Sequence, residues 1–258
     1  MRCGVGAETP DELLQALFLD GQAKLRARCP TQHEEQCWST RDERFRASDA
    51  LVAAVANDLA ALEKAGVDVV RCRVAVVCVE RLNDAVDRGK SRLDVDLNAM
   101  ERLVVAARGD AGEDLLATCG KVGGIDRYPS RFDALASYLV SSIEEGRARS
   151  AYRVAGIGEV AFVRDADASN MLVGMASLVG KWVRDAMMER VVRYHQRDVP
   201  TAPTVSGYND PKTARFIDET ALSRKTRNMP DRCFERRRIG ELPKVLPISA
   251  DAQDAARH

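Results

Sequence analysis

Apolar residues recur along this chain at the three- and four-residue spacing of amphipathic helices. The first helix is expected just after Thr9, which together with Glu12 matches a capping box. A second is expected to begin after Ser48, a favourable N-cap, and to end at Gly66. The remaining expected helices cover residues 93–108, 130–143, 168–196 and 211–222.

Clusters of β-branched residues between these segments predict strands. Residues 67–79 are rich in valine, which is typical of a strand buried on both faces. A shorter strand is expected over 115–118, and residues 152–163 alternate like a strand, with a bend or tight turn at Gly156 and Gly158. Strands that alternate with helices predict an α/β fold on a mixed sheet.

The composition indicates one folded domain rather than a membrane or secreted protein. The chain has 258 residues, of which 45% are hydrophobic and 30% charged. It contains no apolar run of the roughly 18 residues that a membrane span needs, and its seven scattered cysteines are typical of reduced thiols in a cytoplasmic protein. We expect a single domain over residues 1–240 and a flexible tail over residues 241–258.

The net charge is zero, but its distribution is uneven. Between Lys212 and Arg238 nine lysines and arginines face four acidic residues. Such a basic segment can bind a phosphate backbone or contact a partner protein, and it can equally be a solvated tail.

The long helix expected over residues 168–196 carries the most unusual residues. Lys181 lies in a largely apolar segment, so its ammonium group must reach either solvent or an anion. Asp165 and Asp167 stand at the end of the preceding strand, where carboxylates can bind a divalent cation or interact with the helix dipole. Core packing explains the apolar stripe of this helix without any function.

The order of motifs in this region resembles a known enzyme family. The run Ala176-Ser177-Leu178-Val179-Gly180-Lys181 is followed by Arg184-Asp185 and then by the turn Ser206-Gly207-Tyr208-Asn209-Asp210. This order is similar to the C-terminal half of bacterial ribonuclease HII. Fainter similarities upstream, which extend the match to about residues 9–238, are Asn83 with Lys90-Ser91, Gly123-Gly124, and Glu144-Glu145 followed by Ser150 and Tyr152.

The resemblance implies both a fold and a set of site residues. The fold would be a ribonuclease H-like mixed sheet flanked by helices. Asp167 would be the catalytic metal ligand with Asp165 as its neighbour, and the metal would be Mg²⁺ or Mn²⁺. Ser177 and Lys181 would contact phosphates of the substrate, and Tyr208 would stack on a sugar at an RNA–DNA junction.

Two departures from the family's sequence pattern remove residues that catalysis needs. The family's first strand carries an aspartate-glutamate-alanine-glycine motif, which this sequence lacks, so we expect N-terminal strands to be missing or supplied by another segment or chain. At the position expected for the family's middle aspartate, this sequence reads Thr118-Cys119-Gly120-Lys121. One retained carboxylate cannot position two metals, and a thiol is a poor Mg²⁺ ligand.

We therefore expect this chain alone to bind RNA–DNA hybrids or ribonucleotide-containing duplexes without acting as a nuclease. Endonucleolytic hydrolysis of the RNA strand would need the missing carboxylates. The alternative is a non-enzymatic α/β scaffold or interaction subunit that contacts a partner through its basic C-terminal segment.

The cysteines suggest two further sites. Cys29, His33 and Cys37 are spaced so that one helical face could offer them to Zn²⁺, although the sequence shows no fourth ligand. Cys119 beside Gly120 could be a reactive thiol, but His195 is distant in sequence. Cys72 and Cys78 share strand parity and are expected to pack as small hydrophobic residues.

Overall fold

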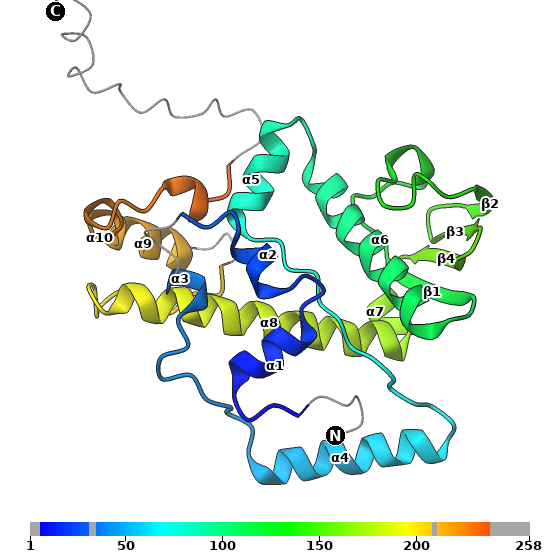
Figure 1. Cartoon of the computed structure of the whole chain (residues 1–258), viewed down its shortest axis with the longest axis horizontal. Helices are drawn as coiled ribbons and strands as arrows, with labels where there is room; N and C mark the ends of the chain where they lie inside the picture. The colour runs from blue at the N-terminus through cyan, green and yellow to red at the C-terminus, as the bar shows by residue number, and fades with distance from the viewer. Residues whose placement is uncertain (1–5, 31–34, 208–210, 238–258) are drawn as a thin grey trace, which may run out of the picture.

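The computed structural model describes residues 6–30, 35–207 and 211–237 (Figure 1). Within them the helices are α1 (Pro10–Leu17), α2 (Gln22–Arg26), α3 (Glu35–Trp38), α4 (Asp49–Lys64), α5 (Val79–Asp87), α6 (Arg92–Ala111), α7 (Ala166–Ser169), α8 (Met171–Gln196), α9 (Pro211–Glu219) and α10 (Ala221–Thr226). The strands are β1 (Leu115–Gly120), β2 (Val140–Glu145), β3 (Arg149–Val154) and β4 (Gly158–Val163), and short 3-10 turns cover Pro129–Arg131 and Asp231–Cys233.

The four strands form a mixed sheet in the order β1-β4-β3-β2. Strands β2, β3 and β4 follow one another as antiparallel neighbours, and β4 lies parallel to β1 with Val163 opposite Gly120. The expectation of an α/β fold on a mixed sheet is thus confirmed. Because β1 and β4 are parallel, their carboxyl ends meet at one edge of the sheet.

One face of the sheet packs against α6. Leu97 and Val104 of the helix belong to the same buried cluster as Tyr152, Val160 and Phe162 of the strands. The loop after β1 covers this core, because the Tyr128 ring stacks on that of Phe162 with 4.0 Å between the ring centroids.

The long helix α8 joins two further hydrophobic clusters. Val183 packs with residues of α1 and the segment after it, Leu14 and Phe18 among them. Further towards the C-terminus of α8, Val192 packs with Phe216 of α9. Figure 1 shows α8 running from the sheet at one end of the molecule to α9 and α10 at the other, so this helix connects the two ends.

The helix starts that the sequence signals are confirmed. Thr9 and Glu12 form the capping box of α1, and the Ser48 hydroxyl accepts a hydrogen bond from the Leu51 amide at the start of α4. These contacts lie within a few residues along the chain, so the local sequence is enough to predict them.

Two of the predictions of secondary structure are wrong. Residues 67–78 form no strand: Val74 makes an isolated bridge to Phe18, and 74% of Val70 is exposed. Residues 130–143 are not a helix either, because a 3-10 turn ends at Arg131 and Val140 begins β2, which pairs with β3. In both places the conformation depends on the partner that the segment meets in the folded chain, Phe18 for Val74 and β3 for β2, which local spacing does not reveal.

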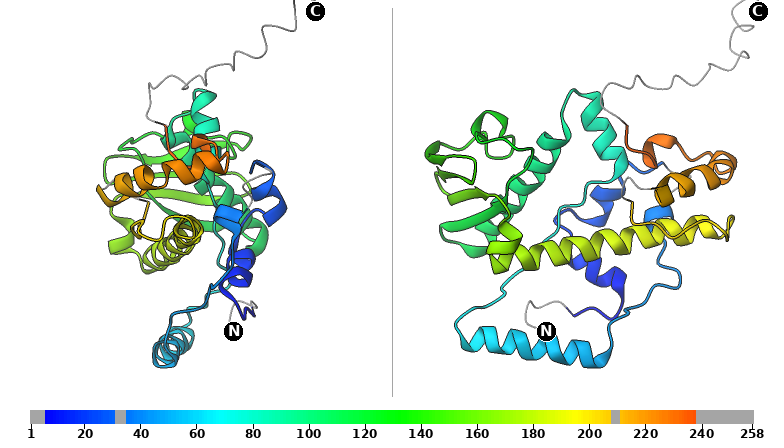
Figure 2. Two further views of the ribbon diagram at one scale, coloured as in Figure 1. Left: turned by 90° about the vertical axis from the view of Figure 1, so that its left-hand side faces the viewer. Right: turned by 180° about the vertical axis from the view of Figure 1, so that it is seen from behind.

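Helix α4 lies apart from the other helices in all three views (Figures 1 and 2). It has no buried residue, and Leu51, Val52 and Val55 expose about half of their surface. Among the described residues no helix is long and apolar enough to cross a membrane.

Candidate functional site

The edge at which β1 and β4 end holds the two aspartates that the resemblance assigns to a metal. The Lys121 amide donates a hydrogen bond to the Val163 carbonyl at 2.9 Å, which ties the strand ends together. Immediately beyond, Asp165 has a left-handed backbone with φ of 51° and begins the single turn of α7, which carries Asp167. Asn170 then caps α8 with its side-chain oxygen.

Asp167 is exposed at this edge, directly over the first turns of α8. A Cβ atom at Gly174 would lie 3.1 Å from the Asp167 carbonyl oxygen, so the small residue lets α7 fold back closely on α8. Asp165 is also exposed, and its carboxylate lies 3.4 Å from Nε of Arg164.

The side chains at this edge do not fit a two-metal centre. The end of β1 contributes Cys119 and Gly120, neither of which is a carboxylate. Within the described residues no three His, Cys, Asp or Glu side chains lie together so that they could hold a metal ion. The assignment of Asp167 and Asp165 to Mg²⁺ or Mn²⁺ therefore stays a prediction from the resemblance.

Ser177 and Lys181 lie one turn apart on α8, and both are exposed. Residues at this spacing are neighbours on a helix surface, roughly 6 Å apart. Neither side chain makes a hydrogen bond or ion pair with another residue that the structure describes. Leu178 between them is 69% exposed, so the apolar stripe expected here covers the core only from Val179 and Val183 onward.

The predicted stacking residue Tyr208 lies outside the described residues, but the start of its turn is visible. Gly207 has φ of 77°, and a Cβ there would approach Sδ of Met188 on α8 to 2.9 Å. Its carbonyl accepts a hydrogen bond from Arg236. Gly207 therefore packs against the C-terminal half of α8, beyond Lys181.

The fainter upstream motifs have structural roles. Asn83 is 1% exposed; its amide group donates to the carbonyls of Arg232 and Glu235, and its oxygen accepts from the Arg237 amide. This side chain thereby fastens the C-terminal segment to α5. Ser91 caps α6 in a capping box with Asp94.

The motif residues around the sheet likewise hold the fold. The buried Ser150 hydroxyl donates to the Asp126 carbonyl at 2.6 Å, and the Tyr152 hydroxyl accepts from the Tyr128 amide. Gly123 has φ of 68°, and a Cβ there would lie 2.8 Å from a methyl carbon of Leu93. Packing and hydrogen bonding account for these residues without a ligand.

The basic C-terminal segment is used within the fold rather than presented as a free stripe. Five of its arginines pair with carboxylates: Arg215 with Glu219, Arg224 with Glu235, Arg227 with Asp198, Arg232 with Glu80, and Arg237 with Asp87. The pairs with Glu80 and Asp87 dock the segment on α5, the pair with Asp198 holds it beside the end of α8, and the other two lie within the segment. The number of basic side chains available to a phosphate backbone or a partner is therefore smaller than the local excess of positive charge suggests.

The thiol sites suggested by the sequence find no support in the described residues. Burial raises the pKa of Cys119 to about 12, which makes it a poor nucleophile at neutral pH. His195 is buried, and its Nε2 lies 2.8 Å from Oε1 of Gln36. Burial also raises the pKa of Cys37 to about 12, and His33 lies outside the described residues.

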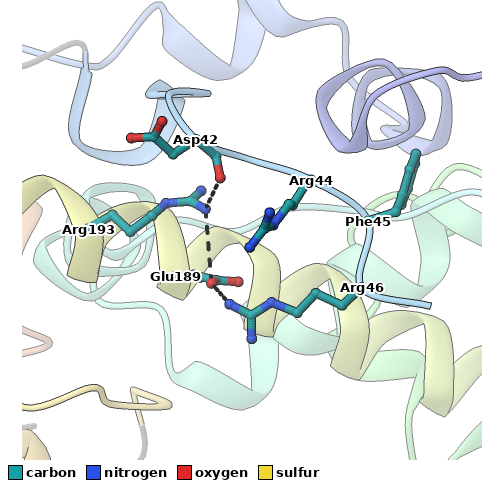
Figure 3. A pocket seen from close by; sticks show the side chains of 6 residues that line it. All are labelled: Asp42, Arg44, Phe45, Arg46, Glu189 and Arg193. Carbon is teal, nitrogen blue, oxygen red and sulfur yellow. Dashed lines mark hydrogen bonds and ion pairs between the residues drawn. The ribbon is translucent and has the colours of Figure 1, made fainter. Parts of the chain in front are cut away.

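One pocket in the structure is not predicted by the sequence. A cavity of about 490 Å³ is lined by Asp42, Arg44, Phe45, Arg46, Glu189 and Arg193 (Figure 3). We call these six residues the arginine pocket. Its signal in the sequence is the run Arg41-Asp42-Glu43-Arg44-Phe45-Arg46, but nothing local indicates that α8 lies beside it.

No family model, no curated protein and no solved structure matches this chain.

Proposed function

We propose that this chain binds duplex nucleic acid that contains ribonucleotides, as its resemblance to ribonuclease HII implies, along the exposed start of α8. The observation that carries the proposal is the pair Ser177 and Lys181, exposed one turn apart and not engaged with other described residues. A hydroxyl and an ammonium group in this arrangement suit adjacent phosphate oxygens.

The neighbouring edge of the sheet supports the same placement. The backbone carbonyl of Asp167 packs against Gly174 of α8. Gly174 precedes Ser177 by three residues, about one turn, so α7 lies beside the helix face that carries the Ser177–Lys181 pair. The mixed sheet covered by α6 is in keeping with the ribonuclease H-like fold that the resemblance implies.

We propose binding and not cleavage for this chain alone. The end of β1 supplies Cys119 and Gly120 in place of a carboxylate, and phosphodiester hydrolysis with two metals needs several carboxylate ligands. Hydrolysis by Asp167 with Mg²⁺ or Mn²⁺ is the second form of the proposal, and it requires ligands from another segment or chain.

The test is the affinity of the full chain for a fluorescently labelled RNA–DNA hybrid, measured by anisotropy at several salt concentrations. We expect Lys181→Gln to weaken binding several-fold and to reduce the slope of log affinity against log salt by about one, because one phosphate contact is lost. Lys64→Gln on the separate helix α4 is the matched control and should leave the affinity unchanged. Equal affinities of the wild type and Lys181→Gln would overturn the proposal.

Two further measurements separate its parts. Tyr208→Ala should weaken binding to a duplex with an RNA–DNA junction more than binding to plain DNA. The reason is that the resemblance implies stacking of the tyrosine ring on the sugar at the junction. Incubation of the hybrid with Mg²⁺ or Mn²⁺ tests the catalytic form, and any cleavage must vanish in Asp167→Asn. Absence of cleavage with both metals contradicts hydrolysis by this chain while leaving the binding proposal standing.

The alternative of a protein-binding subunit is not favoured by the basic segment. Its arginines are engaged with Glu80, Asp87 and Asp198, among others, so a partner would have to displace contacts that hold the fold.

A further inference from the structure

The arginine pocket forms where the loop before α4 crosses the C-terminal half of α8. Asp42 has φ of 59°, a left-handed conformation that aspartate tolerates, and the Glu43 amide closes this turn on the Thr40 carbonyl at 3.1 Å. The turn directs Glu43 to Arg190 and the Asp42 carbonyl to Arg193. Arg44 and Arg46 then follow along the rim.

Three guanidinium groups line this pocket beside the carboxylate of Glu189. Figure 3 shows those of Arg44, Arg46 and Arg193 gathered around Glu189. Arg46 forms an ion pair with Glu189. Nη1 of Arg193 reaches the same carboxylate only at 3.9 Å, and Arg44 makes no hydrogen bond or ion pair with a described residue.

The other carboxylates nearby interact only in part with this charge. Glu43 accepts two hydrogen bonds from Arg190, at 2.9 and 2.7 Å, and lies 3.8 Å from Arg193. Asp42 contacts Arg193 through its backbone carbonyl, and Nε of Arg193 is buried without a hydrogen-bond partner. The lining thus holds three positive side chains against the two negative ones of Asp42 and Glu189.

The chemistry of the lining selects a phosphate group. Guanidinium groups bind tetrahedral oxyanions through paired N–H donors, and their charge persists at every physiological pH. The cavity has the size of a small-ligand site. Figure 3 shows the Phe45 ring pointing away from the guanidinium groups, so the lining offers no stacking surface for a base.

We propose that the arginine pocket is a binding site for a phosphate group, either of a small phosphorylated molecule or of a nucleic-acid backbone. In the occupied pocket the anion takes donors from Arg44 and Arg193, and Glu189 is the internal carboxylate that competes with it. The site lies on a different part of α8 from Lys181, so it does not depend on the function proposed above.

Two substitutions that should change the affinity for phosphate in opposite directions test this site. The probes are inorganic phosphate, pyrophosphate and a short DNA duplex, titrated by calorimetry into the full chain at low ionic strength, where charge effects are largest. Arg44→Gln should weaken binding on the order of tenfold, as expected for loss of a charge-assisted hydrogen bond. Glu189→Gln should strengthen binding, because it removes the competing carboxylate and releases two guanidinium groups.

The control is Arg147→Gln, which removes an exposed arginine without a described partner in the turn between β2 and β3, outside the pocket. If phosphate or pyrophosphate binds and the two pocket variants shift affinity in opposite directions, the site takes free phosphorylated molecules. If only the duplex responds to both variants, the phosphate comes from a nucleic-acid backbone. Binding that ignores Arg44→Gln, or no binding of any probe, overturns the proposal.

Discussion

The guanidinium group of Arg190 is fully buried and donates to both carboxylate oxygens of Glu43, at 2.9 and 2.7 Å. The same group donates to Asp11 at 2.9 Å. One side chain of α8 therefore holds α1 and the loop of the arginine pocket at once, although Asp11 lies 179 residues before Arg190 in the sequence.

We predict that Arg190→Ala strongly destabilises the protein. It leaves the buried Glu43 carboxylate without both of its hydrogen bonds from Arg190, and the loss of a partner from a buried ion pair typically costs about 3–5 kcal/mol. The free energy of unfolding from urea titration measures the effect, with the exposed Arg147→Ala as a control expected within about 0.5 kcal/mol of wild type. A loss for Arg190→Ala as small as that of the control would contradict a structural role for this ion pair.

The buried ring of His195 predicts a loss of stability in weak acid. Burial, followed by the charges of Arg224 and Arg227, lowers its pKa from 6.5 to about 4. Between these two values the unfolded chain binds a proton that the folded chain does not. The free energy of unfolding should therefore fall as the pH drops from about 6.5 to about 4, by up to about 3 kcal/mol from this group.

The contribution of His195 is isolated by comparison with His195→Gln. Unfolding of both proteins is followed by circular dichroism across this pH range, and the difference between the two curves should change by the amount given above. Parallel curves would show that the histidine does not drive the acid dependence.

Glu101 stabilises the loop that covers the sheet. One of its oxygens, Oε2, accepts from the amides of Asp133 and Leu135 at 2.9 and 2.7 Å in a buried position. Glu101→Ala leaves both amides without this partner; that of Leu135 is buried, so the loss should cost about 1–3 kcal/mol. Glu101→Gln keeps an acceptor oxygen there and should recover most of the stability in thermal or urea unfolding. If glutamine were as damaging as alanine, the acceptor would not be the reason for this residue.

Two neighbouring glycines separate backbone conformation from close packing. A Cβ at Gly158 would lie 2.2 Å from the Leu115 carbonyl oxygen, where β4 begins beside β1, whereas Gly156 has open space around it. Both have positive φ, so Gly156→Ala should cost about 1–2 kcal/mol. Gly158→Ala should be far more destabilising, with little folded protein recovered. Similar melting temperatures for the two variants would argue against the close pairing of β1 and β4.

The features that the sequence predicts well are those made by short stretches of chain. The capping contacts of Thr9 and Ser48 involve residues three positions away, and the turn at Gly156 separates two strands that pair with each other. The errors at 67–79 and 130–143 share one cause. Each segment takes its conformation from what it meets in space: Val74 reaches Phe18, and Val140 pairs with Val154.

The site residues also divide into those that a short stretch of sequence indicates and those that only the folded chain brings together. Asp167, Ser177 and Lys181 lie close in sequence, so one motif indicates all three. The arginine pocket combines Arg44 and Arg46 with Arg193, which comes from the far half of the chain. No spacing rule relates these positions, because the contact between the loop and α8 depends on the buried pair of Glu43 and Arg190.

Both proposed phosphate sites lie on α8, and a continuous helix has a fixed rise. From Lys181 to Arg193 the chain advances twelve residues, which corresponds to about 18 Å along the axis. The helix also turns by about 100° per residue, so the two positions differ by a net rotation of about 120° around its axis. A straight duplex that lies against one site therefore does not face the other, and we expect the two sites to take their ligands independently.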